Sequence, residues 1–216
     1  MQAPKQRKEP RERRGAGLLI GAALVLAVVV AAAAFYFLRD GETKAESVAA
    51  AMESAGCTFR TFPATAAGVH ISDPEARPEE WNSYPPTSGP HFGQWVIWGE
   101  YDEPVRLAEA VHNLEHGGIV MYYGKDVPQA EIAAVRGFYR SDPVGMLLAP
   151  LPDLDDKIAL TAWHSPEAVS ATEEVEGQGI LAECTRFDED AFEAFRDEYR
   201  FQGPERIPPE NLQPGS

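Results

Sequence analysis

The sequence predicts an α+β domain that follows one N-terminal transmembrane helix, with a small mixed sheet covered by helices. Three observations support this prediction. A long apolar run stands near the N-terminus, helical and strand-like segments alternate in the second half, and the composition is typical of a globular chain, with 44% hydrophobic and 25% charged residues. The 216 residues provide room for one ordinary domain with attachments.

The apolar run covers residues 15–38 and predicts a membrane-spanning helix. It contains no ionisable side chain other than Tyr36, and at about 1.5 Å per residue it is long enough to cross a hydrocarbon core of about 30 Å. Residues 1–14 carry six basic and two acidic side chains, a net charge of +4. The positive-inside rule therefore predicts a single-pass cell-membrane protein with a basic cytoplasmic tail (1–14) and an extracytoplasmic C-terminal domain.

A cleaved signal peptide is the alternative, because residues 31–34 are all small. A retained anchor is favoured, since the apolar run exceeds the roughly 7 to 15 residues of a signal peptide's core and Phe35 to Phe37 extend it past the alanines. The membrane is thus a predicted partner. Nucleic acid is not, because the formal net charge is −15 and the isoelectric point is about 4.7. A protein partner stays unidentified.

The only cysteines of the chain, Cys57 and Cys184, stand near the two ends of the exported part. An oxidising setting permits disulfides, so a single structural bridge is the natural expectation, and closing so long a loop is worth about 4–5 kcal/mol. A redox pair or thiolate metal ligands are the alternative. That alternative is less favoured, because there is no C-x-x-C spacing and neither cysteine has a histidine beside it.

The segment between the membrane and the domain is rich in alanine. Residues 43–53 predict a short helix that ends at Gly56, so residues 39–56 are expected to form a stalk. Six prolines follow within residues 57–91 and no helical period survives, which predicts a long loop. The extracytoplasmic domain is expected over residues 57–206, with a flexible, proline-rich tail over 207–216.

The first element predicted beyond the proline-rich segment is a helix over residues 103–116. Its apolar side chains fall on one face, Pro104 suits the first turn, and two glycines follow its end. The run of β-branched and aromatic residues at 119–123 then predicts a strand.

A second helix is predicted over residues 128–140, and two strands over 144–149 and 158–163. The last helix covers residues 189–201, where aromatic side chains recur at helical spacing. This order of elements resembles the second half of a thioredoxin-like fold. The likeness rests on element order alone, because the nucleophilic C-x-x-C of that fold is absent.

Candidate chemistry lies in the five histidines of the chain. His112 and His116 are four residues apart on one predicted helix, so both imidazoles project from one face and can share a metal ion. With Glu115 they satisfy the H-x-x-E-H pattern of inverted zinc peptidases, in which the histidines hold zinc and the glutamate deprotonates water. Such an enzyme needs a further carboxylate. Glu173 and Glu174 are available, but they lie in an apparent loop where a solvated charge run explains them.

His91 ends the rigid segment YPPTSGPH (84–91), in which prolines fix the backbone around one imidazole. This rigidity suits a preorganised ligand. It equally suits a tight loop packed under Trp81, Trp95 and Trp98.

The segment YPPTSGPH, followed by Trp95, Gly99 and Tyr101, precedes VHNLEHGGIVMYY, with Ala162-Trp163 and Gly203-Pro204-Glu205 downstream. Over roughly residues 57–206 this pattern resembles the family catalogued as domain of unknown function 3105. The resemblance implies a protein of bacterial type, often membrane-anchored, with no established activity. It also implies a histidine at the position of His70.

Three interpretations follow. The first is an extracytoplasmic domain that binds zinc or copper through His91, His112 and His116, with His70 as a fourth ligand, since neutral imidazoles suit Zn(II) and Cu(II). The second is a zinc hydrolase with Glu115 as general base. The third is a tethered structural or interaction module without metal. Binding is favoured over catalysis, and the remaining histidine, His164, is expected to be structural or exposed.

Overall fold

The computed structural model describes residues 44, 46–65, 67–168 and 177–216 of the chain. The predicted basic tail (1–14) and membrane span (15–38) lie outside the described residues, as do Glu173 and Glu174. Among the helices of the described part, none is both long and apolar enough to span a membrane. A compact unit extends over Ala45–Ser216.

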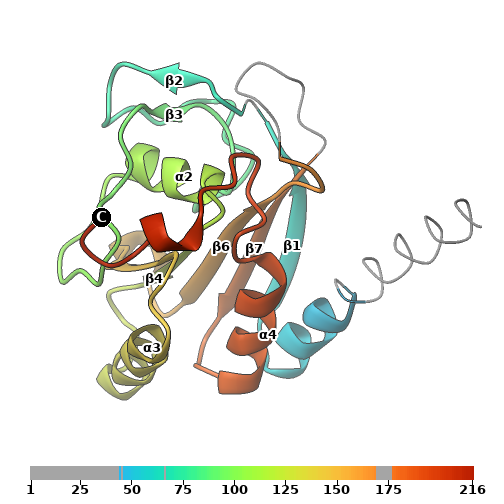
Figure 1. Cartoon of the computed structure of the whole chain (residues 1–216). Coiled ribbons are helices and arrows are strands. Elements are labelled where there is room, and N and C mark those ends of the chain that lie inside the picture. The colour runs from blue at the N-terminus through green and yellow to red at the C-terminus, as the bar shows by residue number, and fades with distance from the viewer. Residues whose placement is uncertain (1–43, 45, 66, 169–176) are drawn as a thin grey trace, which may run out of the picture. The chain divides into compact units, whose positions relative to one another are not determined.

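A five-stranded mixed sheet forms the centre of the compact unit, which confirms the predicted α+β class (Figure 1). Its strand order is β1-β7-β6-β4-β5. The parallel pair is β4 with β5, and all other neighbours are antiparallel. The strands are β1 (Thr58–Pro63), β4 (Ile119–Tyr123), β5 (Met146–Pro150), β6 (Ile158–His164) and β7 (Gln178–Cys184).

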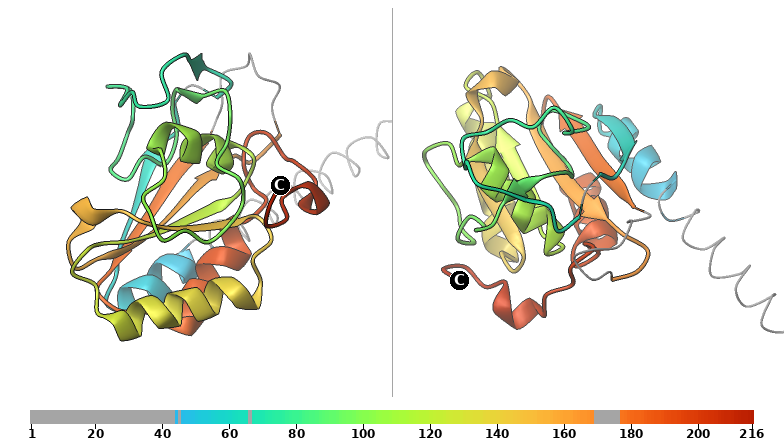
Figure 2. Two further views of the ribbon diagram at one scale, coloured as in Figure 1. Left: turned by 90° about the vertical axis from the view of Figure 1, so that its left-hand side faces the viewer. Right: turned by 90° about the horizontal axis from the view of Figure 1, so that it is seen from above.

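Helices cover both faces of this sheet, which explains why the strand β4 is apolar and buried along its whole length. The helices α3 (Gln129–Ser141) and α4 (Glu189–Tyr199), together with helical residues 46–54, lie on one face, and α2 (Leu107–Glu115) lies on the other (Figure 2). On the strand β4, Ile119 and Met121 belong to the core under α3 and α4, while Val120 and Tyr122 belong to the core under α2. The sheet therefore separates two hydrophobic cores.

The elements predicted from periodicity are present with shifted ends. The helix expected over 103–116 begins later, because the backbone is still extended at Arg106, whose guanidinium bonds Glu75 and Glu109. Pro104 is therefore outside the helix. At α4 the Asp188 side chain accepts a hydrogen bond from the Ala191 N–H and so caps the helix start.

The order β4-α3-β5-β6-β7-α4 contains the elements on which the thioredoxin-like expectation depends, and that expectation stays a prediction. Two strands of the sheet were not expected. The strand β1 lies within the segment predicted as a long loop, and β7 begins just after the described gap at 169–176. The edge strand β1 pairs with β7 along its whole length, from Thr58 opposite Glu183 to Pro63 opposite Gln178.

Two further strands of two residues each, β2 (His70–Ile71) and β3 (His91–Phe92), form a small parallel sheet. The proline-rich segment that contains them crosses above α2, and β3 packs against that helix (Figure 1). Hydroxyl and amide groups fasten this segment internally. The Ser88 hydroxyl accepts hydrogen bonds from the Thr65 N–H and the Asn82 amide, and Thr87 donates to Asn82.

The expected stalk and tail both take part in the folded unit. Val48 and Met52, on helical residues 46–54, are buried in the core with α3 and α4. At the other end Leu212 is buried, and the backbone of Trp98 exchanges hydrogen bonds with residues 215 and 216. Part of the segment 39–56 and much of 207–216 are therefore held against the domain.

Cys57 and Cys184 form a disulfide with a sequence separation of 127 residues, as predicted. The bridge joins the start of β1 to the end of β7. Since both sulfurs are used in this bond, neither is available as a thiolate ligand for a metal.

Candidate metal centre

The helix α2 and the residue that follows it carry three buried polar side chains toward the proline-rich segment. Its apolar residues Val111 and Leu114 pack into the core below, which turns His112 and Glu115 to the opposite side. His116 follows directly after the helix. The polar side chains are almost inaccessible, with His112 at 4% exposure, Glu115 at 3% and His116 at 6%.

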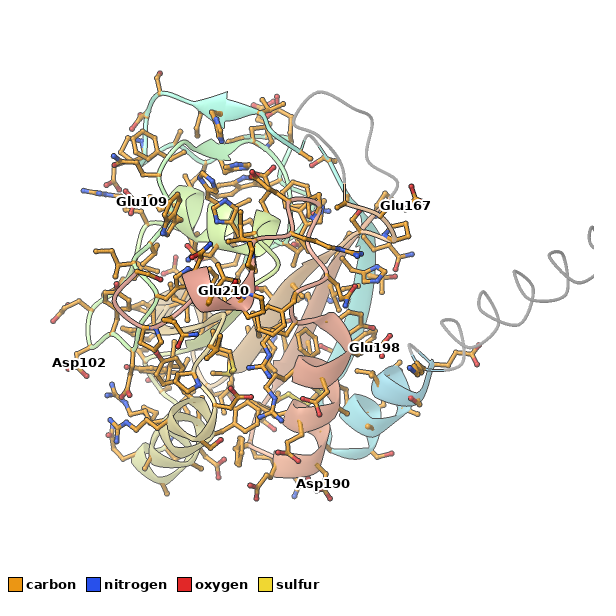
Figure 3. All side chains as sticks on the ribbon, in the orientation of Figure 1. Asp102, Glu109, Glu167, Asp190, Glu198 and Glu210 are labelled. Carbon is orange, nitrogen blue, oxygen red and sulfur yellow. A yellow bond between two sulfur atoms is a disulfide. The ribbon has the colours of Figure 1, made fainter. Side chains whose placement is uncertain are left out.

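The small sheet brings two more imidazoles to this face of α2. His70 and His91 are register partners in the β2–β3 pair, and their ring centroids are 5.0 Å apart. The His112 ring lies 4.8 Å from that of His91 and 5.2 Å from that of His70. Three of the four predicted ligands therefore converge from three separate segments. Side chains that carry nitrogen gather between β3 and α2 in Figure 3.

Glu115 completes this group. Its Oε2 lies 2.9 Å from Nε2 of His91, and its Oε1 accepts a hydrogen bond of 2.5 Å from the backbone N–H of Gly68. One candidate ligand atom from each of His70, His91, His112 and Glu115 can be chosen so that all lie within 4.8 Å of one another. We call these four residues the inner group.

Backbone carbonyls determine which ring nitrogens are available. Nδ1 of His91 lies 2.9 Å from the carbonyl oxygen of Gly89, and Nδ1 of His112 lies 2.9 Å from that of Phe92. A carbonyl oxygen only accepts, so each Nδ1 carries the hydrogen, and in the neutral ring Nε2 keeps a free lone pair. Metal-binding histidines typically show this arrangement, with the second ring nitrogen donating to a backbone carbonyl.

The Nε2 atom of His91 is fully buried and has no aligned hydrogen-bond partner, although Glu115 Oε2 lies 2.9 Å away. In the neutral ring this contact sets a lone pair against a carboxylate oxygen. Two acceptors at such a distance repel each other unless a cation stands near both of them. The cation is either a proton on His91 or a metal ion bound by both side chains.

His116 does not join the inner group. It lies instead with His112 and Glu205, whose candidate ligand atoms also fall within 4.8 Å of one another. The His112 and His116 rings are 4.5 Å apart, and Nε2 of His116 is 3.4 Å from Oε2 of Glu205. We call His112, His116 and Glu205 the outer group, because the Glu205 side chain is 54% exposed. The sequence analysis does not nominate Glu205 as a candidate ligand, and the structure adds it.

Burial favours the neutral form of the His112 and His116 imidazoles. It lowers the pKa of His116 to about 4, with the neighbouring His112 adding to the effect. Burial likewise lowers the pKa of His112, and the nearby His91 acts in the same direction. Burial alone would raise the pKa of Glu115, but the contact with His91 and the N–H of Gly68 outweigh it and lower that pKa. Neutral imidazoles beside a carboxylate are the protonation states that bind a metal.

The hydrolase interpretation requires Glu115 to hold and deprotonate a water molecule. Glu115 is 3% exposed, and both of its oxygens already face the N–H of Gly68 or the ring of His91. This position suits a ligand better than a general base.

The fifth histidine, His164, lies apart from both groups. Its ring packs edge-on to that of Tyr199, with centroids 6.0 Å apart, and it is half-buried. Burial, with a contribution from the charge of Arg206, lowers its pKa. These contacts agree with the structural role expected for it.

Comparisons with known proteins place the chain in a family. No curated protein and no solved structure matches the chain. The family model described as "Protein of unknown function (DUF3105)" matches residues 75–211, which include His91, α2 and Glu205 and leave His70 and β1 outside. Because this match covers more than half of the sequence, the chain belongs to the DUF3105 family.

Proposed function

We propose that this chain binds one divalent transition-metal ion, Zn(II) or Cu(II), through His70, His91, His112 and Glu115. The observation that carries the proposal is the buried Nε2 of His91, which has no aligned hydrogen-bond partner and faces the Glu115 carboxylate at 2.9 Å. A metal ion near both atoms satisfies them together. Three imidazoles and one carboxylate are a donor set that zinc and copper both accept.

The arrangement of His70 and His112 supports a metal ion over a lone proton. A proton shared by His91 and Glu115 satisfies only that pair. It does not explain why the ring centroids of His70, His91 and His112 all lie within 5.2 Å of one another. In a tetrahedral zinc site the donor atoms lie about 3.4 Å apart, given zinc–nitrogen bonds of about 2.0–2.1 Å. The inner group needs a modest contraction to reach this geometry, and His70 is exposed and has room to move.

Local charge also favours a divalent cation. Backbone carbonyls accept from Nδ1 of His91 and Nδ1 of His112, so Nε2 of each ring is the nitrogen left to bind a cation, and Glu115 contributes one buried carboxylate. A bound dication offsets this charge where water cannot reach it. Cu(I) is disfavoured because both cysteines form the disulfide and soft sulfur ligands are therefore missing from the described donor set.

We further propose that the metal-binding domain is extracytoplasmic and anchored by the single span at residues 15–38. The support is the basic cluster before that span, the apolar run itself and the disulfide, which is a bond of oxidising compartments. A reporter fusion after residue 216, assayed for activity on each side of the membrane, tests the orientation. A reporter that is active only in the cytoplasm would contradict it.

A metal-free structural module is the second candidate. It is favoured by the same 2.9 Å contact, because a proton on His91 makes a buried ion pair with Glu115 that ties β3 to α2. In this case the four side chains serve to hold the proline-rich segment on the helix.

Metal quantification separates the two candidates. The full chain, without an affinity tag, is equilibrated with Zn(II) or Cu(II), passed through a desalting column and analysed by mass spectrometry for metal per chain. We expect about one ion per chain, a large loss in the His112→Ala variant, and full occupancy in the matched His164→Ala variant. Equal and near-zero occupancy in all three would favour the structural module.

A further inference from the structure

We infer that the outer group, His112, His116 and Glu205, is an acquisition site from which a metal ion passes to the inner group by exchange of ligands around His112. This inference rests on the proposed function and adds a route by which the ion enters. The two groups share His112 and differ in the exposure of their carboxylates, since the Glu205 side chain is 54% exposed while that of Glu115 is 3% exposed.

The shared histidine allows only one of the two sites to be complete at a time. Nδ1 of His112 donates a hydrogen bond to the Phe92 carbonyl oxygen. Nε2 is therefore the only nitrogen of this ring with a lone pair free to bind a metal ion. A single imidazole lone pair binds one metal ion. The groups are therefore alternative positions for the same ion, and a stoichiometry of one per chain is expected although six side chains belong to the two groups.

The backbone holds Glu205 in place beside α2. The N–H of Glu205 donates to the carbonyl oxygen of Glu115 at 3.0 Å, and the Phe201 N–H donates to the carbonyl oxygen of Gly117 at 2.6 Å. Gly203 lies so close to the turn after α2 that a Cβ there would collide with the backbone of Gly117 and Glu115. The carboxylate of Glu205 is thus a positioned group, unlike the many solvated acids of this chain.

The contacts within the outer group also favour a bound cation. Nε2 of His116 and Oε2 of Glu205 are 3.4 Å apart, and one ligand atom from each of His112, His116 and Glu205 can be chosen so that all three lie within 4.8 Å of one another. Glu115 and Glu205 each have a carboxylate oxygen within 4.8 Å of a ring nitrogen of His112, so two like charges that repel each other face the same imidazole. A cation between them relieves this repulsion.

The direction of transfer follows from the donor sets. The outer group offers two imidazoles and one solvated carboxylate, while the inner group offers three imidazoles and a buried carboxylate. A larger number of ligands and a buried carboxylate favour the inner position at equilibrium, whereas the exposed carboxylate of Glu205 attracts a hydrated dication first. Glu205 is therefore expected to affect the rate of loading and not the final occupancy.

The test follows the loading of the full chain with Cu(II) in a stopped-flow instrument. Bound Cu(II) quenches nearby indole fluorescence, and the Trp95 ring lies 5.6 Å from that of His112 while the Trp163 ring lies 6.3 Å from that of His91. The variants are Glu205→Gln and its matched control Glu210→Gln. Glu210, labelled in Figure 3, is an exposed acid on the short 3-10 helix η2 (Pro209–Asn211) and belongs to neither group.

We expect Glu205→Gln to load about tenfold more slowly than wild type, with an unchanged equilibrium stoichiometry and affinity, while Glu210→Gln loads at the wild-type rate. Loading of Glu205→Gln at the wild-type rate would overturn the inference. A loss of affinity as large as that expected for His112→Ala would also overturn it, because Glu205 would then be a ligand of the resting site.

The proposed function fails in a distinguishable way. A wild-type chain that takes up no Cu(II) or Zn(II) would refute the metal site itself, and the transfer route with it. If the wild-type chain takes up metal, and Glu205→Gln and Glu210→Gln both load at the wild-type rate, the inner site is retained and only the transfer route is refuted.

Discussion

Bound metal should stabilise the folded chain, and the His112→Ala variant should lose most of this effect. In the folded chain Nε2 of His91 and the carboxylate of Glu115 face each other and can bind the same ion, whereas in the unfolded chain they are not held together. A ligand at one hundred times its Kd then stabilises the folded state by about 2.7 kcal/mol. For a unit the size of Ala45–Ser216, about 2–4 °C of Tm correspond to each kcal/mol, so the expected rise is about 5–11 °C.

The variant alters this magnitude in a calculable way. Removing His112 takes one ligand from the inner group. If the Kd for the metal then rises about a hundredfold, the same metal concentration is equal to the new Kd. The stabilisation then falls to about 0.4 kcal/mol, which is a shift of about 1–2 °C. Both proteins are compared by thermal unfolding, monitored by circular dichroism, in EDTA and in excess Zn(II) or Cu(II).

The matched control is His164→Ala, which removes an imidazole outside both groups and should keep the full shift. Equal Tm values for wild type in EDTA and in both metals would refute the reasoning. A shift in His112→Ala as large as that in wild type would refute the ligand assignment, because the metal would then bind elsewhere.

Three other predictions concern the fold. Replacing Cys57 and Cys184 together by alanine should lower the free energy of unfolding by about 4–5 kcal/mol in urea titrations, and leave metal stoichiometry intact because the bridge lies at the far end of β7 from the histidines. Gly203→Ala should lower the free energy of unfolding by about 1–3 kcal/mol, because the added Cβ would collide with backbone atoms. Gly137→Ala should raise it by about 0.5–1 kcal/mol, because this glycine lies on α3 with open space around it. The reverse order of the two variants would contradict the packing. His164 has a lowered pKa when folded, so the unfolded chain binds its proton first and stability should fall as pH drops below about 6.5. In chelator, His164→Gln should flatten this fall, and an unchanged pH profile would argue against the burial of His164.

Local patterns in the sequence were enough to predict the central elements of the fold. The strand β4 is a continuous apolar run between glycines, and both of its faces are buried, which is why the run lacks alternation. The helix α3 shows its buried stripe at Ile132, Val135 and Phe138. These signals come from neighbours in the chain and need no knowledge of distant contacts.

The strands that escaped prediction depend on distant partners. The edge strand β1 reads TFRTFP, is largely exposed and ends in proline, so its strand character comes from pairing with β7 and not from its own composition. The strand β7 contains Gly179 and a short apolar stretch at 180–182, too brief to be distinguished from a loop.

The candidate site shows the same division. The spacing of His112 and His116 predicted that both leave one face of a helix, and Glu115 was singled out beside them. The pairing of His70 with His91 occurs in strands of two residues each, which carry no periodic signal. Glu205 reaches His116 only because the segment after α4 folds back onto the end of α2. The motif Gly203-Pro204-Glu205, which is part of the family resemblance, was the signal in the sequence that could have nominated it.

The disulfide has a mechanical consequence. Cys57 stands between helical residues 46–54 and β1, and its partner Cys184 lies on β7, one strand inward from the sheet edge. A pulling force applied at the N-terminal end of the unit would otherwise begin to peel β1 away at Thr58, the residue next to the bridge. The disulfide transmits such a force directly to β7, so the force reaches the interior of the sheet without first separating β1 from β7.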